Sequence, residues 1–418
     1  MGPAVTLTST FTTATIFDIH LLQGQICSEL TPRDLRRCCL VSRDFYHYFV
    51  PYLYRDITIA RKATYNKFYR PEALVALERN RDHVLSVNCV FAKLWKILLD
   101  HRCFNLRVLK SPSLPYRLQN REENKLELHN IIALMRSCPL LRVVELGHFF
   151  YMKGDIEAFC SVMRNHDQLR EVKIDHHEYV SCQKVRRFLW SSTKLHRLSL
   201  NIVMTYNSQQ FTSEGMQSLI ALSGQEDPVF AMKELDLRGR MHDHEIDVCF
   251  LFLRRCPNLE RLTSPSMYTS KMIHELASII SSTMPYLQHL DMRHLCVPAD
   301  TMALLLSACQ NLRSYKNNRC QELTPALFAA LWNHQDTLKE LNIARDDNED
   351  DTDEDDDVNY AEKTWTMKEV LPRVLYEQVA KLTALEKLGP GRVRRLISAN
   401  PVVVADMLSS GNDMDVEA

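Results

Sequence analysis

The chain has 418 residues, 45% of them hydrophobic, which suffices for two or three ordinary domains or one long repeat array. Its formal net charge of −1 creates no overall field that would attract nucleic acid or an anionic membrane. With only 10 glycines it lacks the glycine-rich phosphate loops of most nucleotide-dependent enzymes. The 13 cysteines include no Cys-x-x-Cys pair. No stretch of the sequence is apolar enough to span a membrane. We therefore expect an intracellular protein, cytoplasmic or nuclear, with free thiols.

The N-terminal part of the chain differs from the rest. Residues 1–15 are rich in threonine, show no secretory signal pattern and are predicted to be disordered. Over residues 16–56, apolar side chains recur at mostly helical spacing, which predicts a small helical module. Thr31 and Pro32 mark the start of a new helix, because threonine caps a helix and proline fits its first position, and Asp34 follows in the first turn. A second amphipathic segment then runs through Leu35, Cys38, Cys39, Val41 and Phe45.

A short apolar phrase repeats along most of the remaining chain. It consists of an apolar residue, two variable residues, a second apolar residue, one variable residue and often a third apolar residue. Six of the nine intervals between copies are 25–28 residues long, within the range of about 20–29 residues for leucine-rich repeats. The longer intervals indicate insertions or missed copies. Clear copies begin at Leu141, Leu169, Leu195, Met232, Leu287 and Leu338, and weaker ones at Leu106, Leu259, Leu312 and Leu385.

Each phrase is expected to form a strand and each intervening segment a helix, after a first strand at residues 57–59. Apolar helical stripes lie at Ile156, Phe159, Val162 and Met163, at Ile273, Leu276, Ala277 and Ile280, and at Met302, Leu305 and Leu306. Several helices end at a cysteine, often followed by proline: Cys103, Cys138, Cys256 and Cys309. Residues from about 100 to 345 thus resemble the long, cysteine-containing class of leucine-rich repeats. This resemblance implies an α/β solenoid with parallel strands on the concave face and helices outside.

The N-terminal module resembles an F-box. The matching residues are Ile26, Leu30, Pro32-Arg33-Asp34-Leu35, Cys38-Cys39-Leu40-Val41-Ser42-Arg43 and Phe45, and Val50 to Arg55 resembles the segment that commonly comes directly after the box in fungal F-box proteins. Two positions depart from the family pattern: Ile19-His20 stands where the family usually has Leu-Pro, and Phe45 stands where it often has tryptophan. An F-box followed by leucine-rich repeats is the architecture of substrate receptors in Skp–cullin–F-box ubiquitin ligases.

This resemblance implies an adaptor that docks on the Skp adaptor and the cullin scaffold and holds a protein client near the ubiquitin-loaded enzyme. Such a chain is not an enzyme itself and needs no catalytic residue, cofactor or metal. The alternative is a leucine-rich-repeat scaffold or regulator without ligase coupling, whose N-terminal helices only cap the solenoid. The residues implied in Skp binding are Ile19, His20, Leu21, Ile26, Leu30, Pro32, Asp34, Leu35, Cys38, Val41, Ser42 and Phe45.

Client binding is expected on the concave face, at the variable residues beside the buried ones. Their charges have mixed signs, whereas a nucleic-acid surface would show a basic stripe with interleaved aromatic residues. A protein client is therefore the better prediction. The candidate residues are Glu145, Glu171, Lys173, Arg197, Glu234, Asp236, Arg261, His289, Asp291, Lys316 and Glu340, with Ser199 and Asn342 at equivalent positions.

Three further features complete the expected organisation. The solenoid is predicted over residues 57–345, an acidic disordered insertion over 346–360, a terminal repeat or cap over 361–408 and a disordered tail over 409–418. The insertion holds ten acids between Asp346 and Asp357; without them 42 acidic residues face 51 basic ones. The histidine pairs at 176–177 and 242 and 244 lack accompanying cysteine pairs, which favours surface loops over a metal site. Cys38 and Cys39 are expected to pack in a core.

Overall fold

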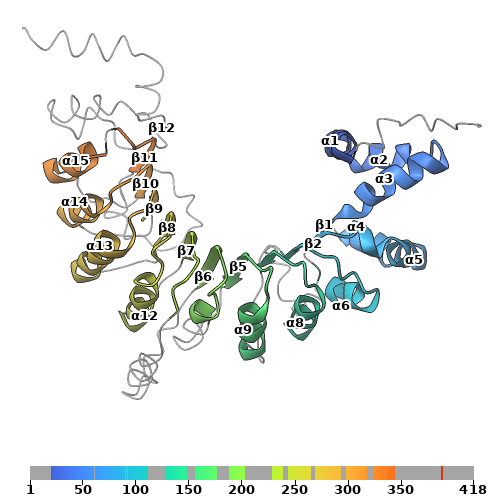
Figure 1. Cartoon of the computed structure of the whole chain (residues 1–418), viewed down its shortest axis with the longest axis horizontal. Helices are drawn as coiled ribbons and strands as arrows, with labels where there is room; N and C mark the ends of the chain where they lie inside the picture. Colours follow the sequence, from blue (N-terminus) through green and yellow to red (C-terminus); the bar gives the residue numbers. More distant parts are fainter. Residues whose placement is uncertain are drawn as a thin grey trace, which may run out of the picture.

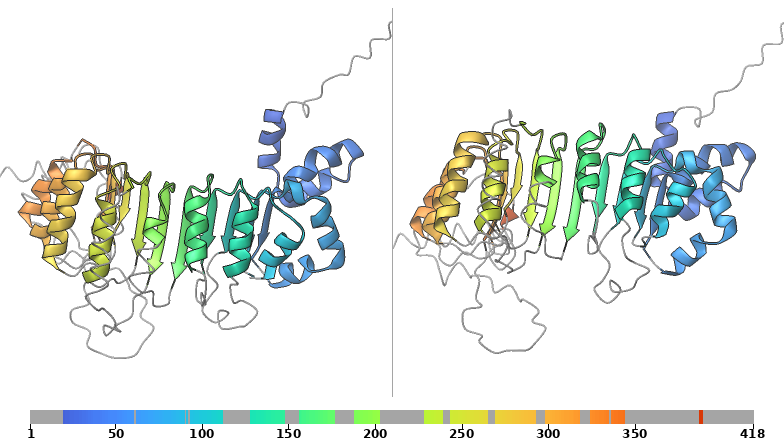
Figure 2. Two further views of the ribbon diagram at one scale, coloured as in Figure 1. Left: turned by 60° about the horizontal axis from the view of Figure 1, so that its bottom comes forward. Right: turned by 90° about the horizontal axis from the view of Figure 1, so that it is seen from below.

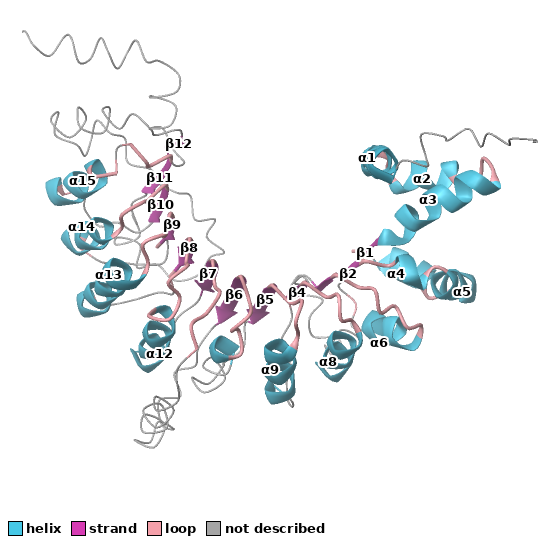
Figure 3. Cartoon of the chain, in the orientation of Figure 1, coloured by secondary structure: helices cyan, strands magenta, loops and turns pink. Residues whose placement is uncertain are grey.

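A computed structural model of the chain shows a curved array of strands and helices (Figure 1). It describes residues 20–60, 62–89, 91, 93–111, 128–147, 156–176, 188–202, 228–238, 243–264, 269–292, 298–317, 324–334, 336–343 and 387–388. In this part of the chain a 12-stranded parallel sheet follows the order of the sequence. Strands line the inner side of the arc and helices cover its outer side (Figures 1 and 3). The predicted α/β solenoid is confirmed.

Three helices precede the sheet, and the third leads directly into the first strand (Figure 2). They are α1 (His20–Glu29), α2 (Pro32–Cys38) and α3 (Arg43–Arg55), followed by β1 (Asp56–Ile59). Thr31 caps α2 by accepting a hydrogen bond from the Asp34 amide at 3.3 Å, and Pro32 is the first residue of the helix. The predicted helix start and the predicted first strand are both confirmed.

The second amphipathic segment is not one helix. It divides because α2 ends at Cys38 and Ser42 caps a new helix by accepting a hydrogen bond from the Phe45 amide at 3.2 Å. A serine that satisfies a free helical N–H favours a new start at this position over continuation of the preceding helix. Val41 therefore lies in the turn between α2 and α3, where its side chain is 67% exposed.

The three helices share a small core of their own. Cys27, Leu35 and Phe49 are buried in it, and the rings of Phe45 and Phe49 lie 5.5 Å apart. The core forms a hydrophobic cluster separate from that of the solenoid. Cys38 and Cys39 are half-buried against it, so the expectation that they pack in a core is confirmed.

The remaining elements alternate between strands and outer helices. The strands are β2 (Ser86–Cys89), β3 (Val108–Ser111), β4 (Val143–Leu146), β5 (Glu171–His176), β6 (Arg197–Ile202), β7 (Glu234–Arg238), β8 (Arg261–Thr263), β9 (His289–Asp291), β10 (Ser314–Asn317), β11 (Glu340–Ile343) and β12 (Lys387–Leu388). The helices are α4 (Lys62–Phe68), α5 (Pro71–Arg79), α6 (Lys93–Asp100), α8 (Leu128–Ser137), α9 (Ile156–Asn165), α12 (Asp243–Leu253), α13 (Ser270–Thr283), α14 (Ala299–Ala308) and α15 (Pro325–Trp332), with the short 3-10 helix η2 (Arg81–His83) before β2.

The repeated phrase forms the core of the solenoid. Val144, Val172 and Leu198 pair in register on β4, β5 and β6, and all three are fully buried. Even the weak copy with Tyr315 keeps this register on β10 and buries its side chain. Each fully buried aliphatic side chain stabilises the fold by roughly 1.5–3 kcal/mol. Since a single unit cannot bury its apolar face alone, stacking produces one continuous core from Ile59 to Leu338.

The predicted helical stripes and cysteine signature are confirmed. The described side chains of the stripes on α9, α13 and α14 face the core. Cys103, Cys138, Cys256 and Cys309 are buried where helices turn into strands. Burial raises the pKa of Cys103, Cys138 and Cys309 to about 12, so these thiols stay protonated at neutral pH.

The structure contains one repeat that was not predicted from the sequence. Its phrase consists of Val84, Val87 and Cys89, all buried; the last two lie in β2, which pairs with both β1 and β3. The strands that flank the long intervals after Leu106, Leu195 and Leu338 pair directly with each other, so no further strand of the sheet lies between them. The weak copy at Leu385 supplies β12, in which Leu388 pairs with Leu341.

Several expectations lie outside the described residues. These are the disordered N-terminus at 1–15, the acidic insertion at 346–360, the tail at 409–418 and, apart from β12, the terminal repeat at 361–408. His177 and His242 also lie outside them. His176 ends β5 and His244 lies in α12, so neither is in the loop predicted for it.

Candidate functional site

The candidate client-binding residues all lie on the concave side of the sheet, in two rows across the strands. The first outer row holds the residue that begins each strand from β3 onward, among them Glu171, Arg197 and Glu234. The second outer row lies two residues further along and includes Lys110, Glu145, Lys173, Ser199, Asp236, Asp291 and Lys316. Because side chains alternate along a strand, both rows point away from the core.

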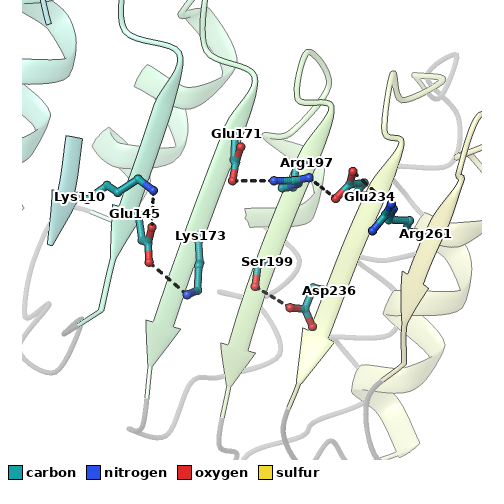
Figure 4. A network of polar contacts seen from close by, with 9 residues as sticks. All are labelled: Lys110, Glu145, Glu171, Lys173, Arg197, Ser199, Glu234, Asp236 and Arg261. Carbon is teal, nitrogen blue, oxygen red and sulfur yellow. Dashed lines mark hydrogen bonds and ion pairs between the residues drawn. The ribbon is translucent and has the colours of Figure 1, made fainter. Parts of the chain in front are cut away.

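Charges in the first outer row are paired across neighbouring strands (Figure 4). The Arg197 guanidinium lies between two carboxylates: Nη1 is 3.2 Å from Oε1 of Glu171, and Nη2 contacts Oε2 of Glu234. Arg261 extends the row, with its Nε 3.8 Å from Oε1 of Glu234. The hydrogen bond from Arg197 holds the pKa of Glu234 below its usual range, and the two carboxylates raise the pKa of Arg197.

The second outer row is paired in the same way. Nζ of Lys110 is 3.4 Å from Oε2 of Glu145, and Nζ of Lys173 is 3.1 Å from Oε1 of the same carboxylate (Figure 4). Further along, the Ser199 hydroxyl donates to Asp236 at 3.1 Å. Opposite charges facing one another across a sheet each contribute roughly 0.2–1 kcal/mol. The concave face therefore offers a partner a mosaic of paired charges with little net field.

The C-terminal part of the face adds further polar groups. Glu340 accepts a hydrogen bond from the Ser314 hydroxyl at 2.9 Å and lies 3.0 Å from Nζ of Lys316. Burial, with Arg261 nearby, lowers the pKa of His289, so its imidazole is neutral at pH 7. These groups suit hydrogen bonding to a folded or extended polypeptide.

A further row, at the N-terminal ends of the strands and one residue before the first outer row, was not predicted from the sequence. The residue just before each strand follows the first buried residue of the phrase, and in three consecutive repeats it is an arginine: Arg107, Arg142 and Arg170. We call these three residues the arginine row. Each arginine comes directly after the first apolar residue of its phrase, so the row was predictable from the repeat pattern.

The residues predicted to bind the Skp adaptor divide into those packed in or against the core of the helical module and those at its surface. Leu35 is only 5% exposed, and Leu30, Cys38 and Phe45 are half-buried against the same helical core. These four side chains hold the module together. Ile26 is half-buried on α1.

The surface group lies around the starts of α2 and α3 and in the turn between them. Pro32 and Ser42 are exposed, Asp34 is half-buried and Val41 is largely exposed. Neighbouring Leu40, which belongs to the F-box match but not to the predicted contact set, is 79% exposed. Ile19 lies outside the described residues, as do the side chains of His20 and Leu21.

The described residues show no arrangement of groups suited to metal chemistry. Among them, no group of three His, Cys, Asp or Glu side chains is placed to hold a metal ion. No helix in the same part of the chain is both long and apolar enough to cross a membrane.

Replacing Arg197 with glutamine is expected to lower the free energy of unfolding by about 1 kcal/mol at neutral pH and by less in acid. Arg197 lowers the folded-state pKa of Glu234, so their stabilisation is present above the unfolded pKa of glutamate and is lost as pH falls through the lower folded value. Because Arg197 is 47% exposed, solvent screening keeps the effect small.

Urea unfolding followed by circular dichroism between neutral pH and about pH 3 measures this difference. The matched control is Arg254→Gln, which removes one exposed pair with Glu275 outside the network and should cost less. A loss for Arg197→Gln that is the same at every pH would contradict the assignment to carboxylate pairing.

Comparisons with known proteins recover only distant structural likenesses. No protein-family model and no curated protein matches the sequence. The leucine-rich repeat-containing protein LegL7 from Legionella pneumophila is 12% identical, with a TM-score of 0.38, over 72% of this chain and 90% of LegL7. A chain in the crystal structure of the Rad7 and Elc1 complex in yeast is 16% identical, with a TM-score of 0.37, over 78% of this chain and 86% of that chain. Similarity at this level does not transfer a function.

Proposed function

We propose that this chain is the substrate-recognition adaptor of a Skp–cullin–F-box ubiquitin ligase. Helices α1–α3 dock on the Skp adaptor, and the concave face of the solenoid binds a protein client. The client is then held close to the ubiquitin-loaded enzyme, so the chain contributes effective concentration rather than a reacting group. It needs no cofactor for this role.

The observation that supports this proposal most is the exposed Leu40-Val41 pair on a module with its own core. A pure cap would be expected to share the solenoid core that it covers. Helices α1–α3 instead bury Cys27, Leu35 and Phe49 among themselves. They leave Leu40 and Val41 exposed by 79% and 67% at a turn, where neither side chain stabilises the module. Exposed neighbouring apolar residues of this kind suit burial by a protein partner.

One observation favours the alternative of a repeat scaffold without ligase coupling. Helix α3 contacts β1 and η2, so the module also covers part of the first repeat. Capping and docking are compatible, because the contact uses α3 whereas Leu40 and Val41 lie at its opposite end. Binding to the Skp adaptor separates the two functions.

Replacing Leu40 and Val41 together with aspartate is expected to weaken binding of the full chain to a purified Skp adaptor by at least about a hundredfold. Both side chains are exposed, so the helices stay folded while the apolar contact is lost. Isothermal titration calorimetry gives the affinity, and hydrogen exchange of α1–α3 reports the fold. The control is Leu304→Asp on α14, whose side chain is 43% exposed and should leave binding unchanged. No binding by the unmodified chain, or equal binding by the double variant, would rule out this mode of docking.

A further inference from the structure

The arginine row occupies equivalent points on three consecutive repeats. The Arg142 amide donates to the Arg107 carbonyl at 2.8 Å, and the Arg170 amide donates to the Arg142 carbonyl at 2.9 Å. Neighbouring strands of a sheet lie about 4.8 Å apart, so the three side chains start from points within about 10 Å. Three positive charges are therefore gathered at one end of strands β3–β5.

This like-charge row contrasts with the two outer rows of the concave face. In both outer rows, charged side chains meet opposite charges on the next strand, whereas the arginine row places like charges on neighbouring repeats. Arg107 and Arg142 are exposed and form no ion pair with any residue that the structure describes. The Arg170 guanidinium donates to the carbonyls of Asp167 and Leu169 at 2.8 and 3.0 Å. Two exposed guanidinium groups without a charged partner among the described residues, those of Arg107 and Arg142, are suited to an anionic ligand.

The surroundings of the row indicate what kind of anion fits. Val108 and Val143 are half-buried beside it in the first outer row, where strands β5–β8 carry charges instead. Lys110 and Lys173 lie beyond them on either side of Glu145. Along strands β3–β5, the arginine row is therefore followed by an apolar strip, Val108 and Val143. Next come Lys110 and Lys173, whose charges Glu145 partly neutralises. Carboxylates followed by an apolar side chain would match this order.

We propose that the arginine row docks an acidic segment of a protein client, with an apolar residue of that segment over Val108 and Val143. The guanidinium fork binds a carboxylate through two parallel hydrogen bonds, which gives both strength and orientation. The proposal deepens the proposed function, since it rests on the concave face holding a protein client. Nucleic acid fits less well, because Glu145 and Glu171 interrupt the cationic surface and no exposed aromatic side chain lies in the described parts of the three rows.

Fluorescence anisotropy with the full chain tests this assignment. The probe is a fluorescein-labelled 12-residue peptide of repeated Glu-Glu-Leu units, and its neutral counterpart has Gln-Gln-Leu units. We expect the glutamate peptide to bind, the glutamine peptide to bind at least about tenfold more weakly, and the affinity to fall as salt rises. Equal binding of the two peptides, or no binding of either, overturns the proposal.

Charge reversal locates the binding site. Arg107→Glu with Arg142→Glu should weaken the glutamate peptide at least about tenfold. Arg79→Glu with Lys96→Glu makes the same change of net charge on exposed residues of the outer helices α5 and α6, and should change affinity less than about twofold. Equal weakening by both pairs overturns the proposal. Tighter binding of a 12-nucleotide oligo(dT), or of a phosphoserine peptide without glutamate, also overturns it.

The same variants separate this inference from the ligase proposal. Reversal of Arg107 and Arg142 should leave Skp-adaptor binding intact, and the Leu40 and Val41 double variant should leave peptide binding intact. Adaptor binding without peptide binding would reject the arginine row alone. Peptide binding without adaptor binding would reject ligase coupling while leaving the arginine row in place on a scaffold.

Discussion

Replacing Phe252 with alanine is expected to lower the free energy of unfolding by about 3–5 kcal/mol. Phe252 lies on α12 with its side chain fully buried. Its ring centroid is 4.4 Å from that of Phe230 and 5.9 Å from that of Trp190. Trp190 precedes β6 and Phe230 precedes β7, so the three rings join consecutive repeats. Alanine would leave a cavity that stiff neighbouring repeats cannot close.

The expected loss is local before it is global, because each repeat contacts only its neighbours. Hydrogen exchange should show reduced protection in β6–β8 and little change in β3 or β10, while chemical denaturation gives the total cost. The control is Phe252→Leu, which keeps most of the volume and should cost less than about 1.5 kcal/mol. If alanine costs no more than leucine, or if protection falls evenly along the sheet, the aromatic cluster is not what couples these repeats.

The solenoid was predictable because the repeated phrase is itself the core-forming unit. Leu198 or Leu290 at the second apolar position marks a strand whatever the length of the intervening segment. The repeat with β2 was not predicted because Val84, Val87 and Cys89 replace the leucines. All three side chains are nevertheless fully buried, as the leucines of other repeats are. Hydrophobic side chains of the right size satisfy the same position. The type of apolar residue in the phrase was therefore a weaker indication of a strand than the spacing of the three apolar positions.

The charge pairing of the concave face was not predictable in the same way. Glu171, Arg197 and Glu234 are separated along the chain by segments of unequal length, so their alignment depends on the register of three strands. The repeated phrase predicts that these residues lie on one face of the sheet, but it does not predict which of them face one another on neighbouring strands. The pairing changes their interpretation, because much of the charge on this face stabilises the solenoid.

In the N-terminal module, periodicity and capping gave conflicting signals. Val41 continues the apolar spacing of Leu35 and Cys38, which predicted one segment. The Ser42 hydroxyl caps α3, so a new helix begins at Arg43. Val41 therefore remains in the exposed turn that precedes this helix. Leu35 and Val41 match the same motif but differ in role: Leu35 is buried in the core of the module, and Val41 is presented to solvent.

This difference leads to opposite expectations for substitutions at Leu35 and at Val41. Leu35→Asp is expected to unfold α1–α3, because an unpaired carboxylate in the place of a side chain only 5% exposed costs roughly 3 kcal/mol or more. The core involved is small, with Cys27, Leu35 and Phe49 as its buried residues, so a loss of this size exceeds what the rest of it can supply. The separate core of the solenoid should remain folded.

Hydrogen exchange by mass spectrometry resolves the two cases on the full chain. Leu35→Asp should remove protection from α1–α3 while β3–β10 keep theirs, and Skp-adaptor binding should disappear together with that protection. The Leu40 and Val41 double variant should lose the adaptor with protection unchanged. The glutamate peptide should bind both variants as it binds the parent chain, because the arginine row belongs to the solenoid. Retained protection of α1–α3 in Leu35→Asp would mean that the buried cluster around Leu35 does not hold these helices together, and that their stability comes instead from the contact of α3 with the first repeat.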